Sequence, residues 1–407
     1  MRAYHLNLFK PFSALSTSTV SFDMSVALKR PAPPEEACPT STKIPQLEFD
    51  PSTRCKKKMH ALLLMYCGWD YYGMQRSPTH PTVEGELSKA LLACSYLDDL
   101  SAEAYRKVWF QRASKTDKAV SATGQVCSML LPDNDEVASK LNSVLPEHIR
   151  ILDVIRTTRC FAAHSLCSHR IYDYLFPTFV LAPYDLPLVD TLHRSYRVAP
   201  ERLTHVNAVL SRYKGTHNFY NFTSRRLPTD RSCRRFIVSI ECLPPFLICE
   251  SEYAVIRIVG QSFMLHQIRK MIGLMFAVVR GNMDDNVFDI VFGTERVDIP
   301  RAPALGLMLN QVVYSRYNER YGRDGIHKPI EWANYEEQMS NFKVTHIYDH
   351  VHKTESNEGS MLSWLYSLNE RTFLFRDSSN RILDCSSIHP NEDSSESDEN
   401  DTALLAS

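Results

Sequence analysis

A predicted β-hairpin at residues 236–259 constrains the fold of this chain more than any other stretch. Apolar and polar side chains alternate from Phe236 to Cys242, Pro244 and Pro245 interrupt the run, and AVIRIV then resumes strand character. The side chains expected on one face of the first strand are Phe236, Val238, Ile240 and Cys242. Two strands joined over so short a distance pair antiparallel, so the sheet that contains them must include antiparallel pairs.

The remaining predicted elements mix strands and helices without a regular alternation of the two. Strands are expected at residues 60–68, 108–111, 120–131, 148–155 and 171–176. Helices are expected at residues 82–97, 134–143, 200–213 and 262–280. The first of these helices has Thr82 as its expected N-cap. Because the order lacks repeated strand–helix–strand units, we predict an α+β fold with a mostly antiparallel sheet.

The two ends of the chain differ in composition from its body. Residues 24–57 are rich in Pro, Thr and Lys, and we predict a disordered N-terminal arm over residues 1–57. Residues 377–407 contain eight acidic residues, one Arg and many Ser. This composition predicts a disordered acidic tail over residues 376–407. The folded body is therefore expected to span residues 58–375.

The first 22 residues have the composition of a targeting segment. They contain no acidic residue, carry Arg2 and Lys10, and include six Ser or Thr. One interpretation is a mitochondrial transit peptide within residues 1–23, because such peptides are basic, hydroxyl-rich and poor in acids; the other is an ordinary disordered terminus. Translation from Met24 would give a second product without this segment. We therefore expect the protein in the nucleus, in mitochondria or in both.

The net charge conceals a strongly basic stretch. The whole chain carries −1, which by itself argues against a nucleic-acid partner, because such proteins usually carry a basic excess. Eight acids against one Arg give residues 377–407 a charge of −7, so residues 1–376 carry +6. Residues 212–235 alone hold seven Lys or Arg and one Asp, which is again a net +6.

The basic stretch combines cations with aromatic residues. We define the basic patch as Lys214, Arg225, Arg226, Arg231, Arg234 and Arg235. The interleaved rings are Tyr213, Phe219, Tyr220 and Phe222. Cations suit a phosphate backbone and rings suit unstacked bases, so the stretch is a candidate RNA-binding surface. A solvated basic loop is the alternative.

Two polar segments carry candidate chemistry. In RASKTDKAVSATGQV, Asp117 lies between Lys115 and Lys118. Nearby cations lower the pKa of a carboxyl group, so we expect Asp117 to be ionised and able to act as a nucleophile or base; an ordinary charged turn is the alternative. In SHRIYDYLFP, strand periodicity places Arg170, Tyr172 and Tyr174 on one face. That face either holds a base and a phosphate or packs its rings into the core.

The predicted helix at 262–280 has two stripes. Apolar residues around Ile268 form a core stripe. The second stripe is polar, basic and small, and comprises Ser262, His266, Arg269, Gly273 and Arg280. We expect Arg269 at the boundary to bury its stem while its guanidinium reaches a partner. The second stripe is either a solvated face or the place where another surface approaches closely.

The cysteines and apolar runs narrow the class of protein further. The eleven cysteines show no two-residue spacing of the kind that zinc knuckles use, and their scatter suits reduced thiols inside a cell. The sequence therefore predicts no metal site. No apolar run reaches the roughly 20 residues that a membrane helix needs, so no membrane association is expected.

Six ordered motifs carry a resemblance to a known family. They are MYCGWDYYGMQ, RASKTDKAVSA, HRIYDY, KGTHNFYNFT, SFMLHQIRKMIG and IPRAPALGLMLNQVVYSRYNERYGRDGIHKPIEW. Together they resemble the tRNA pseudouridine synthase A superfamily, and its eukaryotic branch most closely. The resemblance runs from about Lys58 to Phe373. It implies an enzyme that isomerises uridine in tRNA to pseudouridine without a cofactor.

The resemblance also implies a fold and an active site. The fold would be an antiparallel sheet shared by two α/β halves, about 58–165 and 166–345, with a cleft between them and a C-terminal helical extension. The catalytic aspartate would be Asp117. Residues implied or expected to bind the substrate are Tyr172 on the flipped base, Arg269 beside the aspartate, Lys115 in base flipping, Arg170 and His266.

The resemblance also bears on the range of substrates, the oligomeric state and the alternative function. Messenger RNA and small nuclear RNA are conceivable further substrates, and the eukaryotic branch resembles monomers. The main alternative function is a non-catalytic RNA-binding or tRNA-chaperone protein. Two positions depart from the family: Lys115 stands where Arg is usual, and Ala119 stands where Gly is usual. Ala119 would strain the loop if its backbone needs a positive φ.

Overall fold

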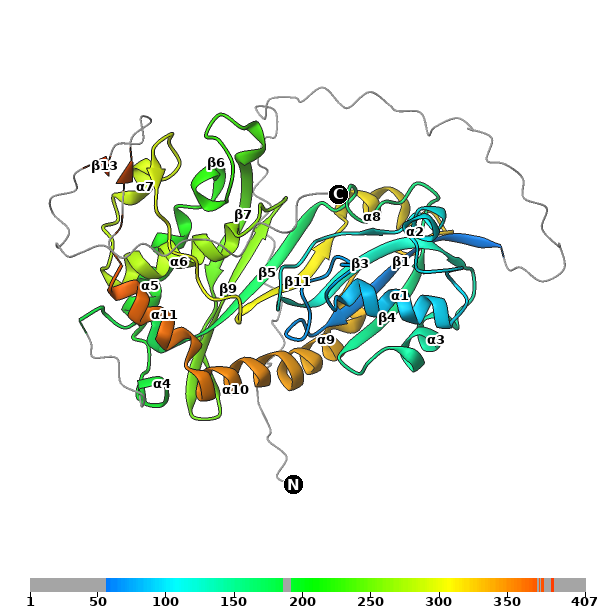
Figure 1. Cartoon of the computed structure of the whole chain (residues 1–407), viewed down its shortest axis with the longest axis horizontal. Coiled ribbons are helices and arrows are strands. Elements are labelled where there is room, and N and C mark those ends of the chain that lie inside the picture. Colours follow the sequence, from blue (N-terminus) through cyan, green and yellow to red (C-terminus); the bar gives the residue numbers. More distant parts are fainter. Residues whose placement is uncertain (1–55, 186–191, 372, 374, 377–381, 384–407) are drawn as a thin grey trace. The chain divides into compact units, whose positions relative to one another are not determined.

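The computed structural model describes residues 56–185, 192–371, 373, 375–376 and 382–383 (Figure 1). The predicted transit peptide, nearly all of the predicted arm and most of the predicted acidic tail lie outside these residues. None of the helices in the described ranges is both long and apolar enough to cross a membrane.

A sheet of ten strands forms the centre of the described structure (Figure 1). Its strands, in spatial order, are β4 (Ile149–Arg156), β1 (Lys57–Tyr66), β3 (Ser121–Pro132), β11 (Leu307–Val313), β5 (His169–Pro177), β9 (Ser251–Gly260), β7 (Arg234–Cys242) and β6 (Gly215–Asn218). Two short strands extend it: β2 (Gln111–Arg112) pairs with β3, and β8 (Phe246–Ile248) pairs with β9. All neighbouring pairs are antiparallel except β3 and β11. The predicted α+β class with a mostly antiparallel sheet is confirmed.

Helices and strands do not alternate regularly along the chain. They are α1 (Val83–Ala93), α2 (Ala102–Lys107), α3 (Val137–Val144), α4 (Leu192–Ser195), α5 (Pro200–Ser211), α6 (Gln267–Arg280), α7 (Val287–Ile290) and α8 (Ser315–Tyr321). The C-terminal helices are α9 (Glu336–Phe342), a π-helical turn (Lys343–Tyr348), α10 (Asp349–Glu358) and α11 (Ser360–Asn369). A second, three-stranded sheet joins β10 (Arg296–Val297), β12 (Phe375–Arg376) and β13 (Ile382–Leu383). Thr82 caps α1 by accepting a hydrogen bond from the Gly85 amide, as predicted.

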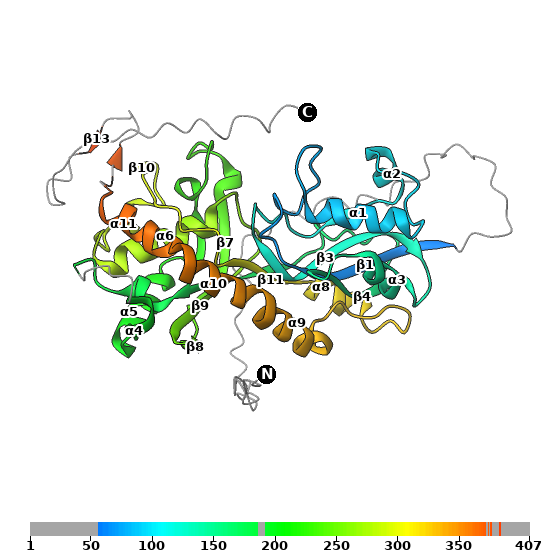
Figure 2. The same cartoon turned by 60° about the horizontal axis from the view of Figure 1, so that its bottom comes forward.

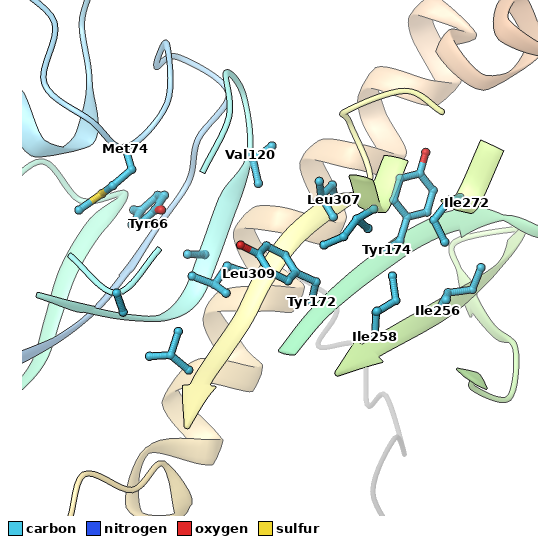
Figure 3. Close-up of a cluster of buried hydrophobic side chains, with 14 of the residues drawn as sticks. Tyr66, Met74, Val120, Tyr172, Tyr174, Ile256, Ile258, Ile272, Leu307 and Leu309 are labelled. Atoms are coloured by element: carbon cyan, nitrogen blue, oxygen red, sulfur yellow. The ribbon is translucent and has the colours of Figure 1, made fainter. Parts of the chain in front are cut away.

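The two faces of the central sheet pack against different helices. On one face, Phe176 contacts Phe276 of α6, with ring centroids 5.1 Å apart. On the other, Leu175 joins an apolar cluster that includes Phe342 and Val351 from the C-terminal helices. These helices run from the β1–β3–β4 strands to α5 and α6 (Figures 1 and 2). Apolar side chains from β1, β5, β9 and β11 line the sheet centre (Figure 3).

A buried ion network joins the C-terminal helices to the sheet centre. Asp173 of β5 is fully buried and accepts hydrogen bonds from Nε and Nη2 of Arg257, at 2.8 and 2.9 Å. Lys343, at the start of the π-helical turn, has its Nζ 3.5 Å from the Asp173 carboxylate. The same Nζ donates to Oδ1 of Asn310 on β11, at 2.9 Å. Strands β5, β9 and β11 are thus tied to the helices behind them.

Two predicted strands and one predicted helix were wrong in detail, and the backbone explains each difference. The strand predicted at 108–111 shrinks to Gln111–Arg112, and Trp109 takes a positive φ of 54°. In β7 a register shift between Ile237 and Ser239 breaks the alternation. Phe236 and Val238 are therefore exposed, whereas Ile237 is buried.

The helix predicted at 262–280 begins only at Gln267. His266 precedes it with φ 63°, in the left-handed region. Helical periodicity therefore does not place Ser262 and His266 on one stripe with Arg269.

Candidate active site

The loop before β3 holds Asp117, and its backbone is fixed at several points. Arg170 donates from Nε and Nη2 to the Ala113 carbonyl, at 3.2 and 2.7 Å. Gln125 bonds both backbone groups of Ser114: its Oε1 accepts from the amide at 3.2 Å and its Nε2 donates to the carbonyl at 2.8 Å. The loop that carries Asp117 is therefore positioned before any substrate arrives.

Side chains continue this anchoring up to the residue before Asp117. The Ser114 hydroxyl lies 2.7 Å from the Tyr172 hydroxyl, and the Thr116 hydroxyl lies 2.8 Å from the Tyr66 hydroxyl. The Met74 amide donates to the Thr116 carbonyl at 3.1 Å. A Cβ on Gly73, whose φ is +103°, would lie 2.6 Å from that carbonyl. The motif MYCGWDYYGMQ thus supports the loop, and Gly73 permits the close contact.

The electrostatic environment of Asp117 differs from the sequence prediction. Burial raises the pKa of Asp117, while Arg269 and Arg301 oppose that rise. The expected lowering by the neighbouring lysines is wrong. Lys118 lies over the Tyr72 ring, with its Nζ 4.2 Å from the centroid, and Lys115 is exposed. The carboxyl side chain keeps 35% relative exposure, so a ligand can still reach it.

Three residues from the later part of the chain lie around Asp117. Nδ1 of His266 is 3.8 Å from Oδ2 of Asp117. Arg269, in the first turn of α6, donates from Nε to the Ala302 carbonyl at 2.7 Å. Arg269 interacts electrostatically with Asp117, but the described residues contain no ion pair under 4.0 Å between the two. Arg301 was not singled out from the sequence, where its only signal was its place inside the IPRAPALG motif.

Tyr172 connects the aspartate loop to the sheet. It is 6% exposed, and its ring meets Phe263 edge-on at 5.3 Å between centroids. Burial raises the pKa of Tyr172, so the phenol is neutral at physiological pH. Tyr174, two residues along the same face, is fully buried, and its hydroxyl donates to the Pro303 carbonyl at 2.9 Å. The core interpretation therefore holds for Tyr174, while Tyr172 lies at the edge of the site.

Other residues of the predicted site serve the protein's own structure. Arg170 is buried, and besides Ala113 its guanidinium bonds the Gln261 carbonyl at 2.7 Å. These contacts favour a positioning role, and its direct contact with substrate stays a prediction. The polar stripe of α6 does not form one open surface. Arg280 is buried and donates to the Ala182 carbonyl at 2.7 Å, and a Cβ on Gly273 would lie 2.1 Å from the Pro300 carbonyl.

The basic patch is exposed, but its aromatic neighbours are not. All six cations are exposed except Arg235, which is half-buried and donates to the Ser262 hydroxyl at 2.8 Å. Arg226 forms an ion pair with Asp230 at 2.9 Å. The interleaved rings Tyr213, Phe219, Tyr220 and Phe222 are buried. The idea that these rings stack on bases is therefore wrong, because they fill the protein core.

Ala119, two residues after Asp117, has φ 63°. This left-handed conformation costs a non-glycine residue about 1 kcal/mol. We expect Ala119→Gly to leave the free energy of unfolding unchanged or raise it by up to about 1 kcal/mol, since glycine's larger unfolded-state entropy offsets part of the gain. Ala138→Gly in helix α3 is the matched control, and it should destabilise by about 1 kcal/mol. Equal destabilisation by both variants in urea unfolding would contradict the strain at Ala119.

Comparisons with known proteins show the family of this chain. Residues 209–315 match the family described as tRNA pseudouridine synthase. The chain is 46% identical over 310 residues to the pseudouridylate synthase 1 homolog of Homo sapiens, covering 75% of this chain and 72% of that protein. It is 32% identical over 388 residues to tRNA pseudouridine synthase 1 of Yarrowia lipolytica, covering 75% and 73%. On this similarity, which extends over most of both relatives, the chain belongs to the tRNA pseudouridine synthase family.

Proposed function

We propose that this chain isomerises specific uridines in tRNA to pseudouridine and that Asp117 starts the reaction. The observation that carries the proposal is the structural and electrostatic environment of Asp117. Its carboxyl group is partly desolvated, its loop is fixed by hydrogen bonds from Arg170, Gln125 and Tyr66, and two guanidinium groups act on its charge. A binding protein would gain nothing from a preorganised carboxylate that faces an anionic backbone.

The reaction rearranges bonds within one nucleotide. The bond between the uracil nitrogen and the sugar breaks, the detached base rotates, and a ring carbon bonds to the sugar, after which that carbon loses its proton. Ionised Asp117 either attacks the nucleotide covalently or removes a sugar proton. The ring edge is inaccessible in a stacked helix, so the nucleotide must be flipped out. We assign Tyr172 to packing on the uracil while it rotates, and Lys115 to flipping.

We infer that the RNA lies in a cleft between the two halves of the sheet. Asp117 precedes β3, whereas His266 and Arg269 come from the segment around the start of α6, so the candidate site draws on both halves. The basic patch reaches this segment through Arg235, which donates to the Ser262 hydroxyl. The role of the patch would be sequence-independent contact with phosphates.

The enzyme can be told apart from a non-catalytic tRNA binder by following the ring-carbon proton. A tRNA transcript labelled with tritium on the uracil carbon that joins the sugar is incubated with the full chain. Isomerisation releases tritium to water in proportion to the pseudouridine formed. Binding without tritium release would favour the chaperone alternative.

Range and place of action are further parts of the proposal. We propose that the protein is a monomer that acts in the nucleus, in mitochondria or in both. Its substrates would extend beyond tRNA to messenger or small nuclear RNA. The support for two compartments is the acid-free composition of the first 22 residues, followed by Met24. Cell fractionation of a C-terminally tagged chain, with and without Met24→Ala, tests it; an unchanged distribution would contradict two translation products.

A further inference from the structure

Arg301 is held rigidly beside Asp117 by its neighbours along the chain. The Ala302 amide donates to the Arg269 carbonyl at 3.0 Å, and Nε of Arg269 donates back to the Ala302 carbonyl at 2.7 Å. On the other side, the Pro300 carbonyl approaches Gly273 so closely that no side chain fits there. The backbone of Arg301 is thus fixed against α6, while its side chain is exposed.

His266 orients the Arg301 side chain toward the aspartate. Nη1 of Arg301 lies 3.2 Å from Nε2 of His266. A guanidinium only donates, so Nε2 accepts and the imidazole proton lies on Nδ1. Nδ1 is the atom that faces Oδ2 of Asp117 at 3.8 Å. Arg301 therefore donates to His266, and the protonated Nδ1 of His266 faces the Asp117 carboxylate at a separation longer than a hydrogen bond.

The positive charge at this point exceeds what Asp117 needs. Arg269 and Arg301 both act on the carboxylate. The pKa of Arg269 is lowered first by burial and next by repulsion from Arg301. Lys270 also has Arg301 among the cations that lower its pKa, which burial brings to about 8. Gathering like charges is unfavourable, and an incoming anion would relieve it.

We propose that Arg301 binds a phosphate of the RNA strand beside the flipped-out uridine, and that His266 holds its guanidinium in place. The inference rests on the proposed function and names a contact within it. Arg269 is half-buried, with its Nε engaged by the Ala302 carbonyl. Arg301 is exposed and has donors left after its bond to His266. A guanidinium also matches the geometry of a phosphate, since it can donate two parallel hydrogen bonds.

The test measures RNA binding as well as turnover. For Arg301→Gln in the full chain we expect KM for tRNA to rise about tenfold, and the slope of log affinity against log salt to fall by about one, as for one lost phosphate contact. Arg301→Lys should recover part of the affinity, because it keeps the charge without the fork. Arg106→Gln, on α2 and exposed, is the matched control and should leave the slope unchanged.

His266 is tested as a positioning residue through coupling. Asn tolerates the left-handed backbone of position 266, so His266→Asn is the variant of choice. We expect His266→Asn by itself to raise KM for tRNA. In a chain that already carries Arg301→Gln, we expect it to cause no further rise in KM. An unchanged salt slope in Arg301→Gln, or full additivity of the two changes, would overturn the proposal. The salt slope is read from binding, so it stands apart from the tritium assay on which the proposed function depends.

Discussion

Replacing Asp117 with Asn is expected to lower the rate of pseudouridine formation by roughly 10⁴-fold or more, the size of loss seen when an attacking group is removed from an active site. Asn fits the same volume, and the loop is held by Arg170, Gln125 and Tyr66 rather than by the carboxylate. The variant should therefore fold and bind tRNA while losing chemistry. The measurement is single-turnover tritium release from labelled tRNA, with binding followed in parallel.

The matched control for this variant is Asp135→Asn, which removes an exposed carboxylate just before α3. It should leave the rate unchanged. The pH dependence adds a second check. Burial raises the pKa of Asp117 above its ordinary 3.8, and the reaction needs the ionised form. As the pH is lowered, the rate should therefore begin to fall at a pH above the pKa of an ordinary aspartate. Wild-type rates in Asp117→Asn would contradict the assignment of this residue.

Replacing Asp173 with Asn is expected to lower the free energy of unfolding more than replacing the exposed Asp298 does. The carboxylate is fully buried between Arg257 and Lys343. Removing it leaves two cations facing each other, and such losses cost roughly 3–5 kcal/mol. The Arg257 side chain is 35% exposed, so water screens part of the loss and we expect about 3 kcal/mol. Urea unfolding followed by fluorescence measures it.

An exposed ion pair provides the comparison for Asp173. Asp298 bonds Arg371 with similar chemistry, but both side chains are about two-fifths exposed. Asp298→Asn should therefore cost no more than about 1 kcal/mol. If Asp173→Asn proves as mild as Asp298→Asn, the buried network does not secure the C-terminal helices to the sheet.

Local patterns predicted most elements of the fold, but long-range pairing lay beyond them. The hairpin of β7 and β9 and the cap of α1 by Thr82 follow from neighbouring residues. Strand β11 does not, because it pairs with β3 and β5, both distant in sequence. A periodic pattern also could not show the register shift in β7, which moves Ile237 rather than Phe236 into the core.

The same distinction applies to the candidate site. Motifs singled out Asp117, Tyr172 and Arg269 by residue type and spacing. The direction of the Asp117 pKa shift required the three-dimensional burial that outweighs its cations. The sequence patterns did not indicate Arg301, because its position beside His266 depends on the packing of Pro300 against Gly273. The buried rings of the basic stretch show the opposite error, since their composition suited RNA while their positions serve the core.

The most direct test of pseudouridine synthesis by this chain is a pseudouridine map of tRNA from cells that lack it. The cells are complemented with the wild-type chain or with Asp117→Asn, expressed at equal levels. We predict that a defined set of tRNA pseudouridines disappears on deletion, returns with the wild-type chain and stays absent with the variant. A map that deletion leaves unchanged, or that Asp117→Asn restores, would contradict it.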